Sequence, residues 1–87
     1  MKISVWDTYI TRKDGEIMHF DILAPTEVTN ANTIFEYGNS YLQSKPFTTG
    51  TLTSKECNFC HIQEASKVIV EDVKKKGYHI IEIENCT

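Results

Sequence analysis

The sequence contains no long hydrophobic run and no export signal. No apolar stretch approaches the roughly 20 residues that a membrane-spanning helix needs. The first seven residues carry one lysine, no extended apolar core and no small-residue cleavage site, so they do not resemble a signal peptide. We therefore expect a cytoplasmic protein that does not bind membranes and whose cysteines are reduced.

Basic residues are also scarce. The chain has 9 Lys and Arg against 12 Asp and Glu, which gives a net charge of −3. Nucleic-acid-binding proteins usually present a basic face that displaces counterions from phosphates. The one basic run, Lys74 to Lys76, ends a predicted helix, where lysines complement the negative end of the helix dipole. The sequence thus predicts no nucleic-acid partner.

Three motifs of common enzyme classes are missing. There is no serine nucleophile elbow, no phosphate-binding loop and no dinucleotide fingerprint. The 87 residues, 40% hydrophobic and 24% charged, fit one globular domain over residues 1–87 with a single two-layer core. This balance is ordinary for a globular protein. The leading interpretation is a binding or accessory domain, and whether the chain is an enzyme is left open.

Residues 2–11 and 17–24 are rich in β-branched and aromatic side chains and predict two strands. Lys13 to Gly15 between them suits a three-residue hairpin loop with glycine in the left-handed position. In the register that this loop sets, one face carries Trp6, Thr8, Ile10, Met18, Phe20 and Ile22. The opposite face carries Val5, Asp7, Tyr9, His19 and Asp21.

Helical periodicity predicts one helix over 31–45 and a second over 63–76, with a short strand near 52–57 and a closing strand over 78–84. The expected fold class is α/β (α+β), a two-layer sandwich in ββαβαβ order. Because strands joined through a helix usually run parallel with right-handed crossovers, we expect a four-stranded mixed sheet with both helices on one face. The last two strands would then end on the same edge.

The run Cys57-Asn58-Phe59-Cys60-His61 carries the most specific chemistry. Two residues between thiols let both sulfurs reach one centre, as in zinc sites. If the last two strands share an edge, Cys86 joins Cys57 and Cys60, and His61 or His79 supplies the fourth ligand. The sequence therefore predicts zinc at Cys57, Cys60, His61 and Cys86.

The same run permits two other interpretations. In a thiol redox protein, Cys57 would be the nucleophile and Cys60 the resolving thiol, although Glu56 opposes thiolate formation. The cysteines would otherwise be small buried hydrophobic residues. Covalent haem attachment, which uses the same spacing, is excluded because it normally takes place outside the cytoplasm.

The polar face of the hairpin is a second candidate site. Asp7 and Asp21 face each other, and Tyr9 lies opposite His19 one step along the strands. Like charges in direct opposition are unfavourable, so one carboxyl would hold a proton or a cation would lie between them. Asp7, His19 and Asp21 could then perform acid–base catalysis or bind a divalent ion, and a purely structural network is the alternative.

The uncovered sheet face also suggests a third role. With both helices on one side, Val5, Tyr9, Tyr78 and Ile80 would be left on the other. An apolar patch with a charged rim often marks a partner surface, so a homodimer through the open sheet face is a further hypothesis.

Several segments resemble a family of small bacterial proteins of about ninety residues, grouped as a domain of unknown function. They extend over nearly the whole chain: Val5-Trp6-Asp7-Thr8-Tyr9, Lys13-Asp14-Gly15, Met18-His19-Phe20-Asp21, Thr53-Ser54-Lys55-Glu56-Cys57-Asn58-Phe59-Cys60-His61 and Gly77-Tyr78. The resemblance implies a compact α/β domain of bacterial origin. It implies no activity, because the family has none assigned.

Overall fold

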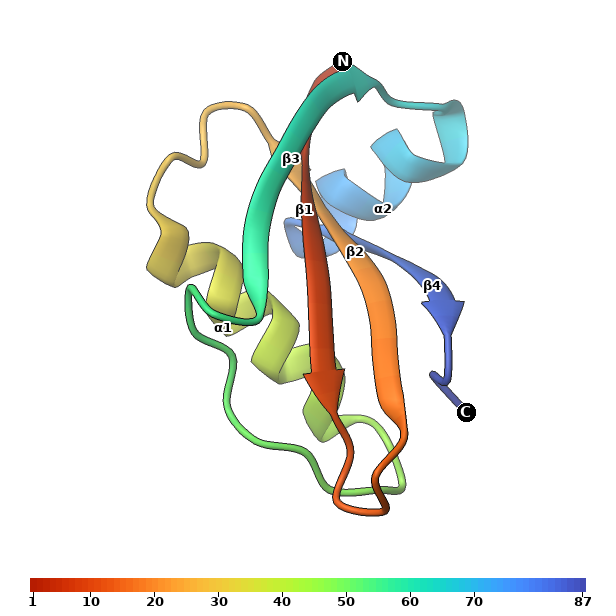
Figure 1. Cartoon of the computed structure of the whole chain (residues 1–87). Helices are drawn as coiled ribbons and strands as arrows, with labels where there is room; N and C mark the ends of the chain where they lie inside the picture. The colour runs from red at the N-terminus through yellow and green to blue at the C-terminus, as the bar shows by residue number, and fades with distance from the viewer.

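A computed structural model describes all 87 residues as one sheet of four strands with two helices (Figure 1). The strands are β1 (Lys2–Thr11), β2 (Ile17–Pro25), β3 (Cys57–Glu64) and β4 (His79–Glu84), and the helices are α1 (Ala31–Gln43) and α2 (Lys67–Lys76). The ββαβαβ order and the α+β class are confirmed. Neither helix is long and apolar enough to span a membrane.

The hairpin has the predicted register. Arg12 donates its backbone N–H to the carbonyl of Glu16 at 2.7 Å, and Gly15 adopts a φ of 94°. A residue with a side chain is strained there, which explains the glycine. Asp7 pairs with Asp21 and Tyr9 with His19, so both predicted faces of the hairpin are confirmed.

The sheet is antiparallel throughout, and the prediction of a mixed sheet is wrong. Its strand order is β3-β1-β2-β4, with β3 antiparallel to β1 and β4 antiparallel to β2. Glu64 at the end of β3 pairs with Lys2, and His79 at the start of β4 pairs with Leu23. Both points lie at one end of the sheet, so α2 joins the outer strands there and β3 and β4 run in opposite directions.

The two helices cover opposite faces of the sheet, so the prediction of one covered face is also wrong. Ile34 and Leu42 of α1 pack in the core that contains Phe20 and Ile22. Ile69 of α2 instead packs on a separate cluster made of Ile3, Val5 and Leu23. Since successive strand residues point to opposite faces, these two sets lie on opposite sides of β1 and β2.

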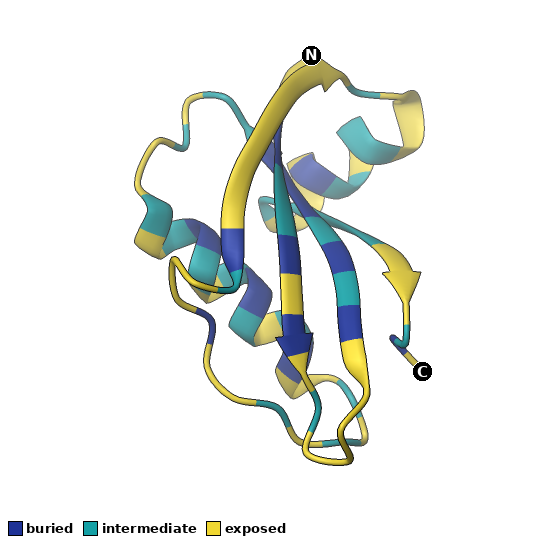
Figure 2. Cartoon of the chain, viewed as in Figure 1, coloured by how far each residue is buried: buried dark blue, intermediate teal, exposed yellow.

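Most of the predicted open face is therefore covered. Val5 is buried beneath α2, Ile80 packs against the α1 core, and the Tyr78 ring stacks on Tyr37 at 4.6 Å. Only Tyr9 of the four predicted residues is half exposed. What remains open is the part of the hairpin near its turn, where Figure 2 shows exposed and intermediate positions between buried ones.

Element boundaries differ most around the cysteine run. α1 begins after Asn30, whose side chain accepts the N–H of Asn32 at 2.9 Å, and ends two residues before the predicted position. The strand expected over 52–57 instead begins at Cys57, and α2 begins after Ser66 rather than at residue 63. All residues of β3 after Cys57 are exposed, so no hydrophobic alternation indicates this edge strand in the sequence.

Candidate functional site

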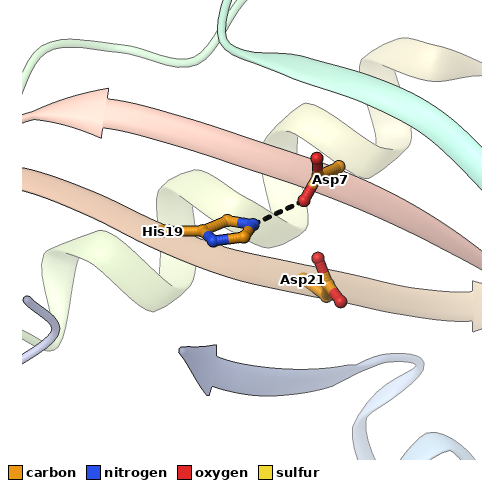
Figure 3. Close-up of side chains that lie close together, drawn as sticks. All are labelled: Asp7, His19 and Asp21. Carbon is orange, nitrogen blue, oxygen red and sulfur yellow. Dashed lines mark hydrogen bonds and ion pairs between the residues drawn. The ribbon is translucent and has the colours of Figure 1, made fainter. Parts of the chain in front are cut away.

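The polar face of the β1–β2 hairpin brings together Asp7, His19 and Asp21 (Figure 3). One ligand atom from each residue lies within 4.8 Å of the other two. No other three His, Cys, Asp or Glu side chains in the chain meet this condition. The hairpin register creates the group, because Asp7 and Asp21 are directly opposite and His19 is two residues from Asp21 on the same face.

The imidazole of His19 is held on two sides. Its Nε2 lies 2.6 Å from Oδ1 of Asp7, and its ring stacks on Tyr9 with 4.0 Å between centroids and 12° between planes. The His19 side chain is 20% exposed and that of Asp7 is 38% exposed. The imidazole is thus oriented by packing and by a carboxylate while the site stays open to solvent.

The carboxyl group of Asp7 disfavours ionisation of Asp21. Burial raises the pKa of Asp21, and the hydrogen bond to Asp7 and the negative charge of Asp7 raise it further. The imidazoles of His19 and His61 act in the opposite direction on the pKa of Asp21. A proton or a cation between the carboxyl groups relieves this repulsion.

The surrounding face is acidic. Loss of hydration raises the pKa of the Tyr9 hydroxyl, and the carboxylates of Asp7, Asp21 and Glu84 raise it further. Tyr9 therefore stays neutral around neutral pH and contributes its ring and hydroxyl rather than a phenolate. The negative potential that suppresses its ionisation attracts cations to the same surface.

The group lies on an open surface. Five hollows indent the molecule, and none of them is lined by Asp7, His19 or Asp21. Sites for small-molecule substrates are usually concave and bury most of the ligand. The geometry therefore favours binding of an ion or a partner over chemistry on an enclosed substrate.

The residues of the predicted zinc site do not converge. Cys57 is buried beside the α1 core, whereas Cys60 and His61 are exposed on β3. Cys86 is buried after β4, where its thiol donates to the carbonyls of His19 and Glu84. Because β3 and β4 form opposite edges, three strand spacings of about 14 Å in total separate them. The convergence was predicted from parallel outer strands, which the sheet does not contain.

His79 does not complete that site either. It lies at the start of β4, at the other end of the strand from Cys86, and its Nδ1 is 2.7 Å from Oδ2 of Asp72 in α2. The hydrogen bond to His79 lowers the pKa of Asp72, and the nearby Lys76 lowers it further. The contact between His79 and Asp72 ties α2 to β4.

The extended backbone of β3 also separates the two thiols of the redox hypothesis. Residues three apart in a strand lie about 10 Å apart, whereas a disulfide needs Cα atoms about 4.4–6.8 Å apart. All three cysteines are free thiols. Burial raises the pKa of Cys57, which makes this thiol a poor nucleophile. α2 begins seven residues after Cys60, so neither cysteine lies at the N-terminus of the helix.

His61 also lies on the face that carries Asp7, although the sequence predicted it in the zinc site of the cysteine run. It pairs with Val5, whose side chain is on the same face as Asp7, and not with a residue that faces the α1 core. Its Nδ1 lies 3.2 Å from Sγ of Cys60 and its Nε2 lies 2.8 Å from Oε1 of Gln63. No local pattern reveals this position, because it depends on an irregular pairing between β1 and β3.

Comparison with known proteins finds a matching family and a similar solved structure. The sequence profile of the domain of unknown function DUF2024 matches residues 1–83. The solution NMR structure of protein NE1680 from Nitrosomonas europaea is similar over 100% of both chains, with 37% identity and a TM-score of 0.80. No curated protein matches. The family expected from the sequence is thereby shown, and this chain belongs to the DUF2024 family of domains of unknown function.

Proposed function

We propose that the chain is a small cytoplasmic domain of bacterial origin that binds one divalent metal ion through Asp7, His19 and Asp21. The observation that carries this proposal is the proximity of three ligand atoms within 4.8 Å of one another. The acidic surroundings and the opposed carboxyl groups support it, because a cation offsets a repulsion that the fold otherwise retains.

The donor set indicates the class of metal. One imidazole nitrogen and two carboxylate oxygens suit zinc and the other first-row divalent ions, whereas magnesium and calcium prefer oxygen ligands alone. Three protein ligands would leave at least one position of the ion for water or for a group from a partner. An open coordination position on an exposed face fits a domain that binds or presents an ion.

Calorimetric titration of chelator-treated protein with Zn²⁺ tests the proposal. We expect about one ion per chain, with at least tenfold weaker binding for His19→Ala and Asp21→Asn. His79→Ala is the matched control, because His79 also pairs with an aspartate, at 2.7 Å, but lies outside the group. This control should bind as the unmodified chain does.

Two results would contradict the proposal. One is the absence of binding at ion concentrations well above those of a folded-protein site. The other is binding that His19→Ala leaves unchanged and Cys60→Ser abolishes. That result would mean that the cysteine run binds the metal. The titration thus also tests the zinc prediction made from Cys57, Cys60, His61 and Cys86.

The other hypotheses gain no observation of their own from the fold. Acid–base catalysis by Asp7, His19 and Asp21 lacks a hollow for a substrate above the group. A homodimer through the open face would bring two acidic surfaces together, since Asp7, Asp21 and Glu84 surround Tyr9. A shared cation is the condition under which such a dimer would form.

A further inference from the structure

We infer that His61 is a fourth protein ligand of the ion proposed at Asp7, His19 and Asp21, with Cys60 as the hydrogen-bond partner of its other ring nitrogen. This inference rests on the proposed function and names an additional residue of the same site. It also gives a role to the Cys60–His61 pair, which the sequence singled out for metal binding and which the three-residue group does not use.

A β-bulge is what places His61 on the metal-binding face. Asn58 pairs with Asp7 and Phe59 with Trp6, but Val5 pairs with His61, so Cys60 is an extra residue in β3. Without the bulge, His61 would pair with Ser4 instead of Val5. Its side chain would then point to the opposite face, because a shift of one residue exchanges the two faces of a strand. Bulges of this kind are frequent beside functional sites, where they redirect a side chain.

The resulting position lies within reach of the group. His61 is opposite Val5, two residues along β1 from Asp7, so the two residues are diagonal neighbours on one face. Diagonal neighbours across a strand pair lie about 7–8 Å apart, which aromatic and long side chains can bridge.

No packing against the core prevents the exposed ring of His61 from turning toward the ion. Its side chain is exposed, and its Nε2 is engaged only by Gln63, at 2.8 Å. Its Nδ1 already contacts the Cys60 thiol at 3.2 Å. A histidine that ligates a metal usually keeps a hydrogen bond through its other nitrogen. We therefore assign Nε2 of His61 as the ligand atom, released from Gln63, with Nδ1 still directed at Cys60.

The test uses NMR of the full chain with ¹⁵N-labelled histidine. On addition of Zn²⁺, the Nε2 resonances of His19 and His61 should both move to metal-bound positions. Those of His79, paired with Asp72 and outside the group, should not move, which makes His79 an internal control. His61→Ala should weaken zinc binding at least tenfold, while Gln63→Ala should preserve or tighten it because it removes a competing hydrogen bond.

The outcomes separate this inference from the proposed function. If His19 responds to zinc and His61 does not, the fourth ligand is refuted while the three-residue site stands. If neither imidazole responds, both proposals fail. A backbone amide spectrum of His61→Ala that matches the unmodified chain confirms that any loss of binding is not caused by unfolding. His61→Ala protein that binds zinc with unchanged affinity would also overturn the inference.

Discussion

At the scale of single residues, the open half of the hairpin is organised around two carboxyl groups that face each other. Asp7 has a hydrogen-bond partner in the imidazole of His19, whose Nε2 lies 2.6 Å from its Oδ1. Asp21 lacks such a partner, and burial together with Asp7 raises its pKa. Ionisation of Asp21 in metal-free protein is therefore less favourable than in the unfolded chain.

Asp21→Asn should stabilise the metal-free protein at neutral pH. A carboxyl group whose folded pKa is raised loses stability as pH rises from its unfolded pKa, near 4, through its folded pKa. The substitution removes that loss, so we expect a gain of about 0.5–1 kcal/mol in the free energy of unfolding at pH 7. The gain should shrink as the pH falls toward about 4, as measured by urea unfolding at several pH values.

The control for this experiment is Glu36→Gln, which removes one negative charge from the exposed surface of α1. It should change stability by less than about 0.5 kcal/mol at either pH. A loss of stability for Asp21→Asn at pH 7, or an equal gain at pH 7 and pH 4, would show that repulsion between the carboxyl groups does not govern this position.

The three thiols should differ sharply in reactivity. Cys57 and Cys86 are 1% and 5% exposed, whereas Cys60 is exposed at the bulge. A thiol reagent should modify one cysteine per chain rapidly in the folded protein and all three in denaturant, because the thiolate must be accessible to react. Cys60→Ser should remove the fast phase, and rapid modification of two cysteines in the folded chain would contradict the burial of Cys57 and Cys86.

At the scale of elements, α1 packs closely on the sheet through a glycine. A Cβ added at Gly38 would overlap Cδ1 of Leu52 and come within 2.8 Å of Cδ1 of Ile22. Both side chains are buried and have little room to move away. This close approach explains a residue that otherwise lowers helix stability by about 1 kcal/mol relative to alanine.

Gly38→Ala should therefore destabilise the fold even though alanine favours the helix. Overpacking of a core costs about 1–3 kcal/mol, which exceeds the gain in helix propensity, so we expect a net loss of about 1 kcal/mol. Gly50→Ala is the matched control, because nothing lies within 4 Å of the added Cβ. Urea midpoints of both variants measure the difference, and a Gly38→Ala variant as stable as the unmodified chain would refute the close packing.

At the scale of the whole molecule, Arg12 joins three segments that are distant in the sequence. Its Nη1 donates to the carbonyls of Asn85 and Thr87 at 3.3 and 2.8 Å. Its guanidinium lies 3.7 Å from the ring centroid of Phe47 and also pairs with Asp14. The hairpin loop, the segment after α1 and the C-terminal residues therefore share one cation.

Arg12→Ala should lower the free energy of unfolding by about 2 kcal/mol, because a largely buried cation loses charge-assisted hydrogen bonds and its contact with an aromatic ring. Arg12→Lys should recover only part of this loss, since an ammonium lacks the planar fork of the guanidinium. Lys13→Ala, at an exposed neighbour, is the control. Urea unfolding gives all three values, and equal stability of Arg12→Ala and Lys13→Ala would contradict this role.

How much of the molecule could be predicted depends on the range of the interactions. The register of β1 and β2, and with it the grouping of Asp7, His19 and Asp21, follows from a three-residue loop and an alternating pattern. The caps of α1 and α2 are equally local: Asn30 precedes α1 and Gly77 ends α2, as the predicted start at residue 31 and end at residue 76 require. Neighbouring residues contain all the information that these features need.

The amino-acid sequence by itself determined the hairpin, the two helices, the order of the elements and the polar face on which the candidate site is built. Only the tertiary structure decided that the outer strands are antiparallel at opposite edges, that the helices cover opposite faces, and that the cysteines do not meet. It also decided, through one bulge, the face on which His61 lies. These outcomes depend on pairing between residues far apart in the chain, which is selected by the packing of the whole core and leaves no periodic signal in an exposed edge strand.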